Sequence, residues 1–164
     1  MSTRITYILG FTVIALLLMA SAYLQVFDGI MPCPLCTLQR VSFALLGIIF
    51  LLGLFFHPFR VGRILISLLL AFVTLLGILF SGRQIWLQHF PPASGSECGV
   101  SLQYMLQALP LSEALQKTFQ GSAECSQNGW EFLHLSMPEW ALAWFLLFLG
   151  LSIYLLLREK KNLS

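Results

Sequence analysis

Charged residues are scarce in this 164-residue sequence, since Asp, Glu, Lys and Arg together make up 10% of it, whereas a soluble domain carries about a quarter. With 58% hydrophobic residues, this scarcity excludes an ordinary water-soluble globular protein. It also excludes a disordered chain, because disorder requires low hydrophobicity and high net charge. A net charge of only +2 provides no basic surface for nucleic acid, so we expect no DNA or RNA partner.

Motifs for soluble cofactors are missing as well. The sequence has no G-x-G-x-x-G pattern after a strand and no P-loop, so a bound nicotinamide, flavin or nucleotide is not expected. Internal repeats and low-complexity tracts are also absent. The length fits a single domain over residues 1–164.

What the sequence does contain is a set of long apolar runs without Lys, Arg, Asp or Glu, at 5–27, 41–56, 64–82 and 140–157. A helix needs about 20 apolar residues to cross a bilayer, so the second run is short unless residues 37–40 form its first turn. We therefore predict an all-α fold, an integral membrane bundle of four antiparallel helices. The predicted spans are about 5–27, 37–56, 64–82 and 140–157.

The distribution of positive residues predicts the orientation of this bundle, because Lys and Arg resist translocation. Most of them lie at the termini or in the 57–63 turn, namely Arg4, Arg60, Arg63, Arg158, Lys160 and Lys161. Only Arg40, Arg83 and Lys117 lie on the opposite side. The termini and the 57–63 turn are therefore predicted to be cytoplasmic, and the segments 28–36 and 83–139, with all four cysteines, to be outside.

The first span has a second interpretation. Arg4, the apolar run and Ala20-Ser21-Ala22 also match a signal peptide with an A-x-A cleavage site. Cleavage would leave the later topology unchanged. We expect this segment to be retained, and the intact mass of the purified protein tests that expectation.

The segment 83–139 is rich in Pro, Gly, Ser and Gln, which predicts a solvated loop and not a fifth span. Pro91-Pro92 should stop the third helix. The leucines of 102–109 have helical spacing and predict a short amphipathic helix, and Ser112 is a candidate N-cap for a second one that ends at Gly121.

The stretch WEFLHLSMPEW, residues 130–140, lies immediately before the last span. Its mixture of aromatic, apolar and acidic residues fits a helix lying in the membrane interface. An aromatic belt that only anchors the loop is the favoured alternative.

Cys33 and Cys36 form a C-x-x-C where the chain re-enters the membrane. As a structural crosslink this pair would be weak. A disulfide that closes so small a loop stabilises the folded state by about 2 kcal/mol, whereas one that joins Cys98 to Cys125 would stabilise it by about 3.5 kcal/mol. A zinc site needs four ligands, and the other two cysteines stand far away in the loop. Haem attachment requires His where this chain has Thr37. Redox chemistry without a metal is the favoured interpretation, with a structural disulfide as the alternative.

Arg40 stands four residues after Cys36, so the two share one face of a helix. A fixed cation and a helix N-terminus both favour the thiolate, the reactive form of cysteine. The alternative is an arginine that only reaches the lipid headgroups. A thiolate at the membrane surface needs an electron acceptor, and quinone is the lipid-soluble one. His89, near the outer end of the third span, either helps to hold a quinone carbonyl or is only a polar tip at the headgroups.

As a combination, these features resemble the DsbB family of bacterial inner-membrane oxidases. The resemblance rests on the four spans, the C-x-x-C with Arg at the fourth position after it, the later cysteine pair, and the W-x-F-x-x-L-x-M-P-x-W stretch. It covers nearly the whole chain. It implies a protein-disulfide oxidoreductase of the bacterial inner membrane, with both termini cytoplasmic and the cysteines periplasmic.

The resemblance further implies two disulfides, Cys33–Cys36 and Cys98–Cys125, acting as a relay. A thiolate of a reduced DsbA-like thioredoxin-fold protein would attack Cys98, and the released Cys125 would attack Cys33. Cys36 would then pass electrons to ubiquinone or menaquinone from the membrane quinone pool. The residues expected to bind the quinone are Cys36, Arg40 and His89.

Two other interpretations remain. A relative of vitamin K epoxide reductase would use a similar bundle, quinone and C-x-x-C, but its loop cysteines come before the C-x-x-C, whereas here they follow it. A non-enzymatic membrane subunit would keep Cys98–Cys125 as a structural crosslink, and Cys36→Ser would then be nearly silent for quinone reduction.

Overall fold

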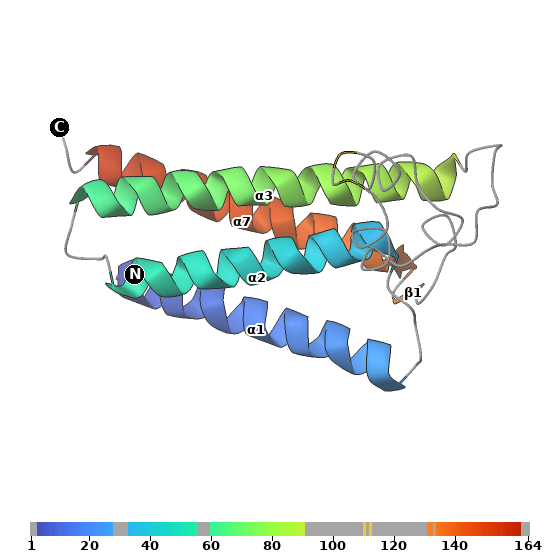
Figure 1. Ribbon diagram of the computed structural model, residues 1–164. Coiled ribbons are helices and arrows are strands. Elements are labelled where there is room, and N and C mark those ends of the chain that lie inside the picture. Colours follow the sequence, from blue (N-terminus) through green and yellow to red (C-terminus); the bar gives the residue numbers. More distant parts are fainter. Residues whose placement is uncertain are drawn as a thin grey trace.

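The computed structural model describes residues 3–27, 33–55, 60–90, 110, 112, 131–132 and 134–161. Four long helices occupy most of this part of the chain: α1 (Thr3–Phe27), α2 (Pro34–Phe55), α3 (Arg60–His89) and α7 (Met137–Lys161). They pack lengthwise, with the start of α1 and the end of α7 at the same end of the bundle (Figure 1). All four are long and apolar enough to cross a membrane. The predicted four-helix membrane fold is therefore confirmed.

The helices extend beyond the predicted spans at the end of the bundle that carries the C-x-x-C. Helix α2 begins at Pro34 and not at residue 37, because proline is well suited to the first helical position, where no N–H partner is needed. Helix α3 continues past residue 82 to His89, since Arg83, Gln84 and Gln88 are good helix formers. It ends ahead of Pro91-Pro92, as predicted.

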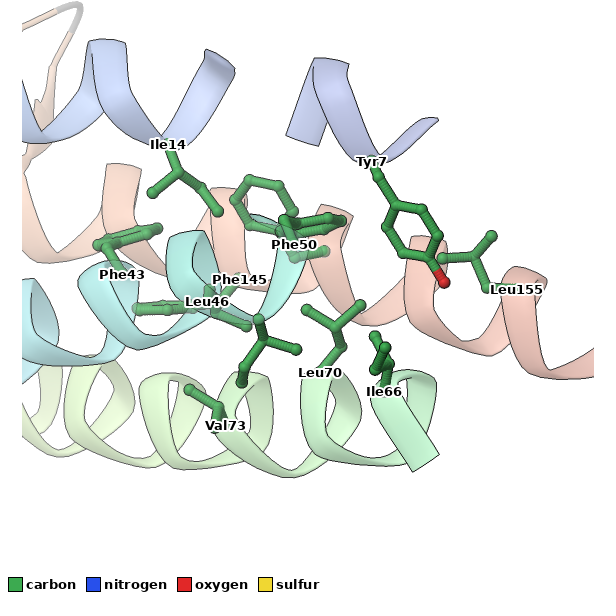
Figure 2. Close-up of a cluster of buried hydrophobic side chains, with 12 residues drawn as sticks. Tyr7, Ile14, Phe43, Leu46, Phe50, Ile66, Leu70, Val73, Phe145 and Leu155 are labelled. Carbon is green, nitrogen blue, oxygen red and sulfur yellow. The ribbon is translucent and has the colours of Figure 1, made fainter. Parts of the chain in front are cut away.

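A single apolar core connects the four helices. Figure 2 shows side chains from all of them pointing toward one another, and the largest fully buried ones are Tyr7, Ile14, Leu46, Phe50, Leu70, Phe145 and Leu155. The rings of Phe43 and Phe145 stack with centroids 4.2 Å apart, which fastens α2 to α7. Helices α2 and α3 are the more buried of the four, and α1 and α7 expose more apolar surface, as expected of outer helices that face lipid.

Glycines allow aromatic rings to approach the helix backbones. A Cβ at Gly77 would lie 2.3 Å from Cε1 of Phe145, and one at Gly53 would lie 2.8 Å from Cε1 of Tyr7. Small residues at such contacts are typical of membrane helices, whose association depends on close van der Waals packing. The identity of these glycines is therefore set by the neighbouring rings.

A β-hairpin precedes α7. Strands β1 (Glu131–Phe132) and β2 (Leu135–Ser136) pair antiparallel, and His134 takes a left-handed φ of 62° at the turn. The interpretation of this stretch as an interfacial helix is therefore wrong. The alternative, an aromatic belt that anchors the loop, stays a prediction. Of the helices predicted for 102–121, all residues except 110 and 112 lie outside the described residues, so these helices stay predictions too.

The local cause of this boundary is the Glu139 side chain, which caps the start of α7. The Ser136 amide donates a hydrogen bond to Glu139 Oε2 at 2.6 Å, and the Ser136 hydroxyl lies 2.9 Å from the same oxygen. A Glu three residues after a Ser satisfies amides at a helix N-terminus that have no partner within the helix. Ser136 thus ends the strand and begins the helix.

Candidate functional site

The C-x-x-C motif forms the N-terminus of α2, and Cys33 is its N-cap. The Cys33 carbonyl accepts a hydrogen bond from the Thr37 amide at 3.1 Å, which closes the first helical turn. The Cys36 amide donates to the Cys33 sulfur at 3.3 Å, where an N-cap side chain usually offers oxygen. Pro34 fills the first helical position. The sequence C-P-L-C therefore starts the helix and places Cys36 in its first turn.

The two sulfur atoms lie 2.9 Å apart. Both cysteines are thiols in this structure, and the predicted Cys33–Cys36 disulfide would be the oxidised state of the same pair. A disulfide bond is about 2.05 Å long, so oxidation requires only a small approach of the sulfurs. Cys33 is 4% exposed and Cys36 is half-buried. Cys36 is thus the more accessible of the two to an outside reactant.

Two buried glutamines connect Cys36 to α3. Gln84 Nε2 donates a hydrogen bond to Cys36 Sγ at 3.0 Å, and Gln39 Nε2 donates to Gln84 Oε1 at 2.8 Å. Both side chains are buried. Sequence reasoning missed them, although a signal existed: Gln39 stands one turn after Cys36, and Gln84 follows closely on the end of an apolar run.

Apolar side chains surround this polar chain. Leu35 and Leu87 are fully buried and form a cluster with Cys33, against which Cys36 and Leu38 pack. Hydrogen bonds in such a low-dielectric setting are stronger than in water. Helix α3 therefore supplies both a donor for the Cys36 sulfur and part of the apolar wall around the pair.

Arg40 lies one turn after Cys36 on α2, as predicted. Among the described residues, its hydrogen bonds go to α1: the guanidinium donates to the Ser21 carbonyl at 3.2 Å and to the side-chain oxygen of Gln25. Figure 1 shows α1 and α2 diverging toward this end of the bundle. Arg40 thus joins the two helices where they separate, a role that the sequence did not predict.

His89 is the last residue of α3 and is exposed. Its Nδ1 lies 3.0 Å from the Ile85 carbonyl, so Nδ1 carries a proton and donates. Trp86 and Phe90, whose ring centroids are 4.8 Å apart, are also exposed at this end of α3. The hydrogen bond described for His89 goes to its own helix and not to Cys36, and its part in quinone binding stays a prediction. Cys98 and Cys125 lie outside the described residues.

Comparison with known proteins assigns this fold and motif to a family. The model of the family described as disulfide bond formation protein DsbB matches residues 3–155. The chain belongs to the DsbB family. Membership confirms the predicted resemblance and makes the chain a membrane protein of disulfide bond formation, with an oxidoreductase role.

Several proteins named disulfide bond formation protein B are similar along most of the chain. The protein of Methylococcus capsulatus is 40% identical over 157 residues, which cover 96% of this chain and 94% of the relative. That of Nitrosococcus oceani is 41% identical over 150 residues, 92% of this chain and 88% of the relative. That of Acinetobacter baylyi is 42% identical over 141 residues, 84% and 81% respectively.

In a DsbB protein the described cysteine pair has the geometry that thiol–disulfide chemistry requires. Such exchange needs a thiolate able to reach a sulfur atom, and here two sulfurs face each other at a helix N-terminus, whose dipole favours negative charge. The half-buried Cys36 is open to a reactant, whereas Cys33 is enclosed. The pair can therefore alternate between dithiol and disulfide while the helix stays in place.

Proposed function

We propose that the chain is a quinone-dependent thiol oxidase of the bacterial inner membrane. It reoxidises a periplasmic DsbA-like thioredoxin-fold protein and passes the electrons through two cysteine pairs to ubiquinone or menaquinone, which sustains disulfide bond formation. The observation that carries the proposal is the Cys33–Cys36 pair, with its sulfurs 2.9 Å apart at the start of a membrane helix. Membership of the DsbB family supports it.

In the proposed relay, electrons enter at the loop pair. A thiolate of the reduced partner attacks Cys98, breaks the Cys98–Cys125 bond and forms a mixed disulfide. The released Cys125 thiolate attacks Cys33, breaks the Cys33–Cys36 bond and frees Cys36 as a thiolate. The partner's second thiol then resolves its mixed disulfide and frees Cys98 as a thiolate. This thiolate attacks Cys125, breaks the Cys33–Cys125 bond made in the previous step, forms the Cys98–Cys125 bond again and releases Cys33 as a thiol. Two electrons and two protons leave the partner in each cycle.

The inner pair returns to its disulfide by giving up these electrons. A bound quinone supplies the two-electron, two-proton acceptor, and quinol leaves into the bilayer. Each 30 mV of potential difference corresponds to about 1.4 kcal/mol for a two-electron step, so a modest gap between the pairs makes each transfer effectively one-way.

The residues around Cys36 suit a quinone head group. Leu35, Leu38 and Leu87 provide apolar surroundings beside the half-buried sulfur, and a quinone carbonyl needs a hydrogen-bond donor. We propose Arg40 for this role, in line with the family, and His89 as a second donor. The Gln84 amide lies within 3.0 Å of the same sulfur.

The proposed orientation places both termini in the cytoplasm and the cysteines in the periplasm. The described ends of the helices support it: Arg4 near the start of α1, Arg63 near the start of α3 and Arg158 near the end of α7 lie at one end of the bundle, opposite Cys33 (Figure 1). Positive residues prefer the cytoplasmic side. A labelling experiment tests this orientation. The outer membrane of intact cells is permeabilised, and the reduced protein is treated with a membrane-impermeant maleimide, with which only periplasmic cysteines would react.

The deciding experiment follows the absorbance of oxidised quinone under anaerobic conditions. Purified protein is mixed with ubiquinone and a reduced DsbA-like protein, and the wild type is compared with Cys36→Ser and Arg40→Ala. We expect the quinone band to disappear with the wild type, to persist with Cys36→Ser and to fade more slowly with Arg40→Ala. An unchanged band with the wild type and both quinones, given intact disulfides and a competent partner, would refute the oxidase and favour the structural subunit.

A further inference from the structure

The two buried glutamines form a chain with a fixed direction that ends on the Cys36 sulfur. A carboxamide has one acceptor oxygen and one donor nitrogen, and Gln84 has both engaged. Its oxygen accepts from Gln39 at 2.8 Å and its nitrogen donates to Cys36 at 3.0 Å. With Gln39 donating as it does, a flip of the Gln84 amide alone would place two N–H groups against each other. Gln39 therefore holds Gln84 in the orientation that offers an N–H to sulfur.

The two sulfurs of the pair differ in what they accept. Cys36 Sγ accepts a hydrogen bond from the Gln84 side chain at 3.0 Å, and Cys33 Sγ accepts a longer one, of 3.3 Å, from the Cys36 amide. Donors stabilise the charged form of an acceptor, and a hydrogen bond to an ionised group is roughly twice as strong as a neutral one. The shorter hydrogen bond to Cys36 and its greater exposure, compared with the enclosed Cys33, therefore favour a thiolate at Cys36 and a thiol at Cys33.

The cation nearest to Cys36 on α2 is Arg40, and the hydrogen bonds described for it do not go to the Cys36 sulfur. Both hydrogen bonds of Arg40 described above go to α1, at Ser21 and Gln25. The side chain seen donating to the Cys36 sulfur from a neighbouring helix is the neutral amide of Gln84. Because an amide does not titrate, its contribution is present at every pH at which the protein is folded.

We propose that Gln84, oriented by Gln39, is a positioning residue that places the thiolate of the reduced inner pair on Cys36. After reduction of the pair, the electrons are then passed on from the half-buried Cys36 and not from the enclosed Cys33. The catalytic use of this asymmetry rests on the proposed function. The asymmetry itself is a property of the dithiol and is measurable without quinone or partner.

The test measures alkylation rates of the reduced full-length protein in detergent, anaerobically and at neutral pH, with peptide mass mapping to separate Cys33 from Cys36. In Gln84→Leu we expect alkylation of Cys36 to slow by about tenfold, the size expected for losing one hydrogen bond to a charged group. Gln39→Leu should slow it by less, about threefold, because the donor remains but loses its orientation. Gln88→Leu is the matched control, since Gln88 lies one turn further along α3 and contacts Ser136.

The direction of the change separates this role from a structural one. Loosened packing would expose both cysteines and speed their alkylation, whereas loss of the donor slows Cys36 alone. If Gln84→Leu does not fold, Gln84→Met keeps the length of the side chain without the donor. Wild-type alkylation of Cys36 in a folded Gln84 variant, or an equal change at both cysteines, would overturn the proposal.

Quinone reduction by the same preparations distinguishes the two proposals. If the wild type leaves quinone oxidised while Cys36 alkylation still depends on Gln84, the oxidase function is refuted and the assignment of the thiolate to Cys36 stands. If the wild type reduces quinone while Cys36 alkylation is independent of Gln84, the positioning role of Gln84 is refuted and the oxidase function stands.

Discussion

The guanidinium of Arg40 donates to the main-chain carbonyl of Ser21, and this hydrogen bond of 3.2 Å joins the first third of α2 to the last third of α1. Gln25, one turn after Ser21, accepts from the same guanidinium. The arginine that the family resemblance assigns to quinone thus also attaches a helix. Loss of Arg40 has two separable consequences, one for the packing of α1 and one for the proposed chemistry.

Gln25→Ala separates these consequences, because it removes one attachment and leaves Arg40 in place. We expect Arg40→Ala to lower the free energy of unfolding by about 1–2 kcal/mol and Gln25→Ala by about half of that, as for hydrogen bonds to a charged group. Thermal unfolding in detergent measures both, and quinone titrations of the two variants measure KM. We expect Arg40→Ala to raise the KM for quinone and Gln25→Ala to leave it close to the wild-type value. An equal rise in both variants would mean that Arg40 acts through α1.

Gly77 lies at the contact between α3 and α7, where a larger side chain would clash with Phe145. A Cβ there would meet Phe145 Cε1 at 2.3 Å, so Gly77→Ala should destabilise the protein by about 1–3 kcal/mol, the usual cost of overpacking. Phe145→Leu in the same chain should recover part of the loss by making room. The measurement is the midpoint of thermal unfolding for both single variants and the double variant.

Gly82→Ala is the matched control on the same helix, because nothing lies within 4 Å of a Cβ at that position. It should leave the midpoint unchanged or raise it slightly, since alanine is favoured over glycine inside a helix by about 0.5–1 kcal/mol. Equal destabilisation by the two alanines would refute the steric explanation.

The sequence predicted the four helices because the length of an apolar run is a local property. It also predicted the C-x-x-C at the entrance of the second helix and the end of the third one before Pro91-Pro92. The interaction between Gln84 and Cys36 was beyond such reasoning, since it depends on how α3 is rotated about its axis against α2. Composition and periodicity contain no information on that rotation.

The hairpin shows the same limitation at shorter range. A strand pair over Glu131–Ser136 requires the left-handed backbone of His134, and nothing in the composition of the stretch distinguishes such a turn from an amphipathic helix. The capping box of Ser136 and Glu139 was the readable signal, because a Ser followed three residues later by Glu before an apolar run marks a helix start.

Ser136→Ala should weaken this start of α7. It removes the hydroxyl that donates to Glu139 and lies within hydrogen-bonding distance of Gln88, and the loss of one such hydrogen bond typically lowers the stability by about 1 kcal/mol. Hydrogen exchange of the first α7 amides should increase. Glu139→Gln keeps an oxygen for the Ser136 amide and should show a smaller increase. A larger effect of Glu139→Gln than of Ser136→Ala would contradict the role of the serine hydroxyl in holding Glu139.

Cys33 and Cys36 should differ when each is replaced, although the proposed relay needs both. The Cys33 side chain caps α2 and is 4% exposed, so Cys33→Ala should lower the stability by about 1–2 kcal/mol through loss of the cap and of buried volume. Cys36→Ser keeps the Cys33 cap and a side chain of similar size that still accepts from Gln84, and its unfolding midpoint should remain close to that of the wild type. Quinone reduction should be lost in both variants. Thermal unfolding, measured together with quinone reduction, therefore shows whether Cys36 is needed for electron transfer alone. A strongly lowered unfolding midpoint for Cys36→Ser would instead show that Cys36 also stabilises the fold.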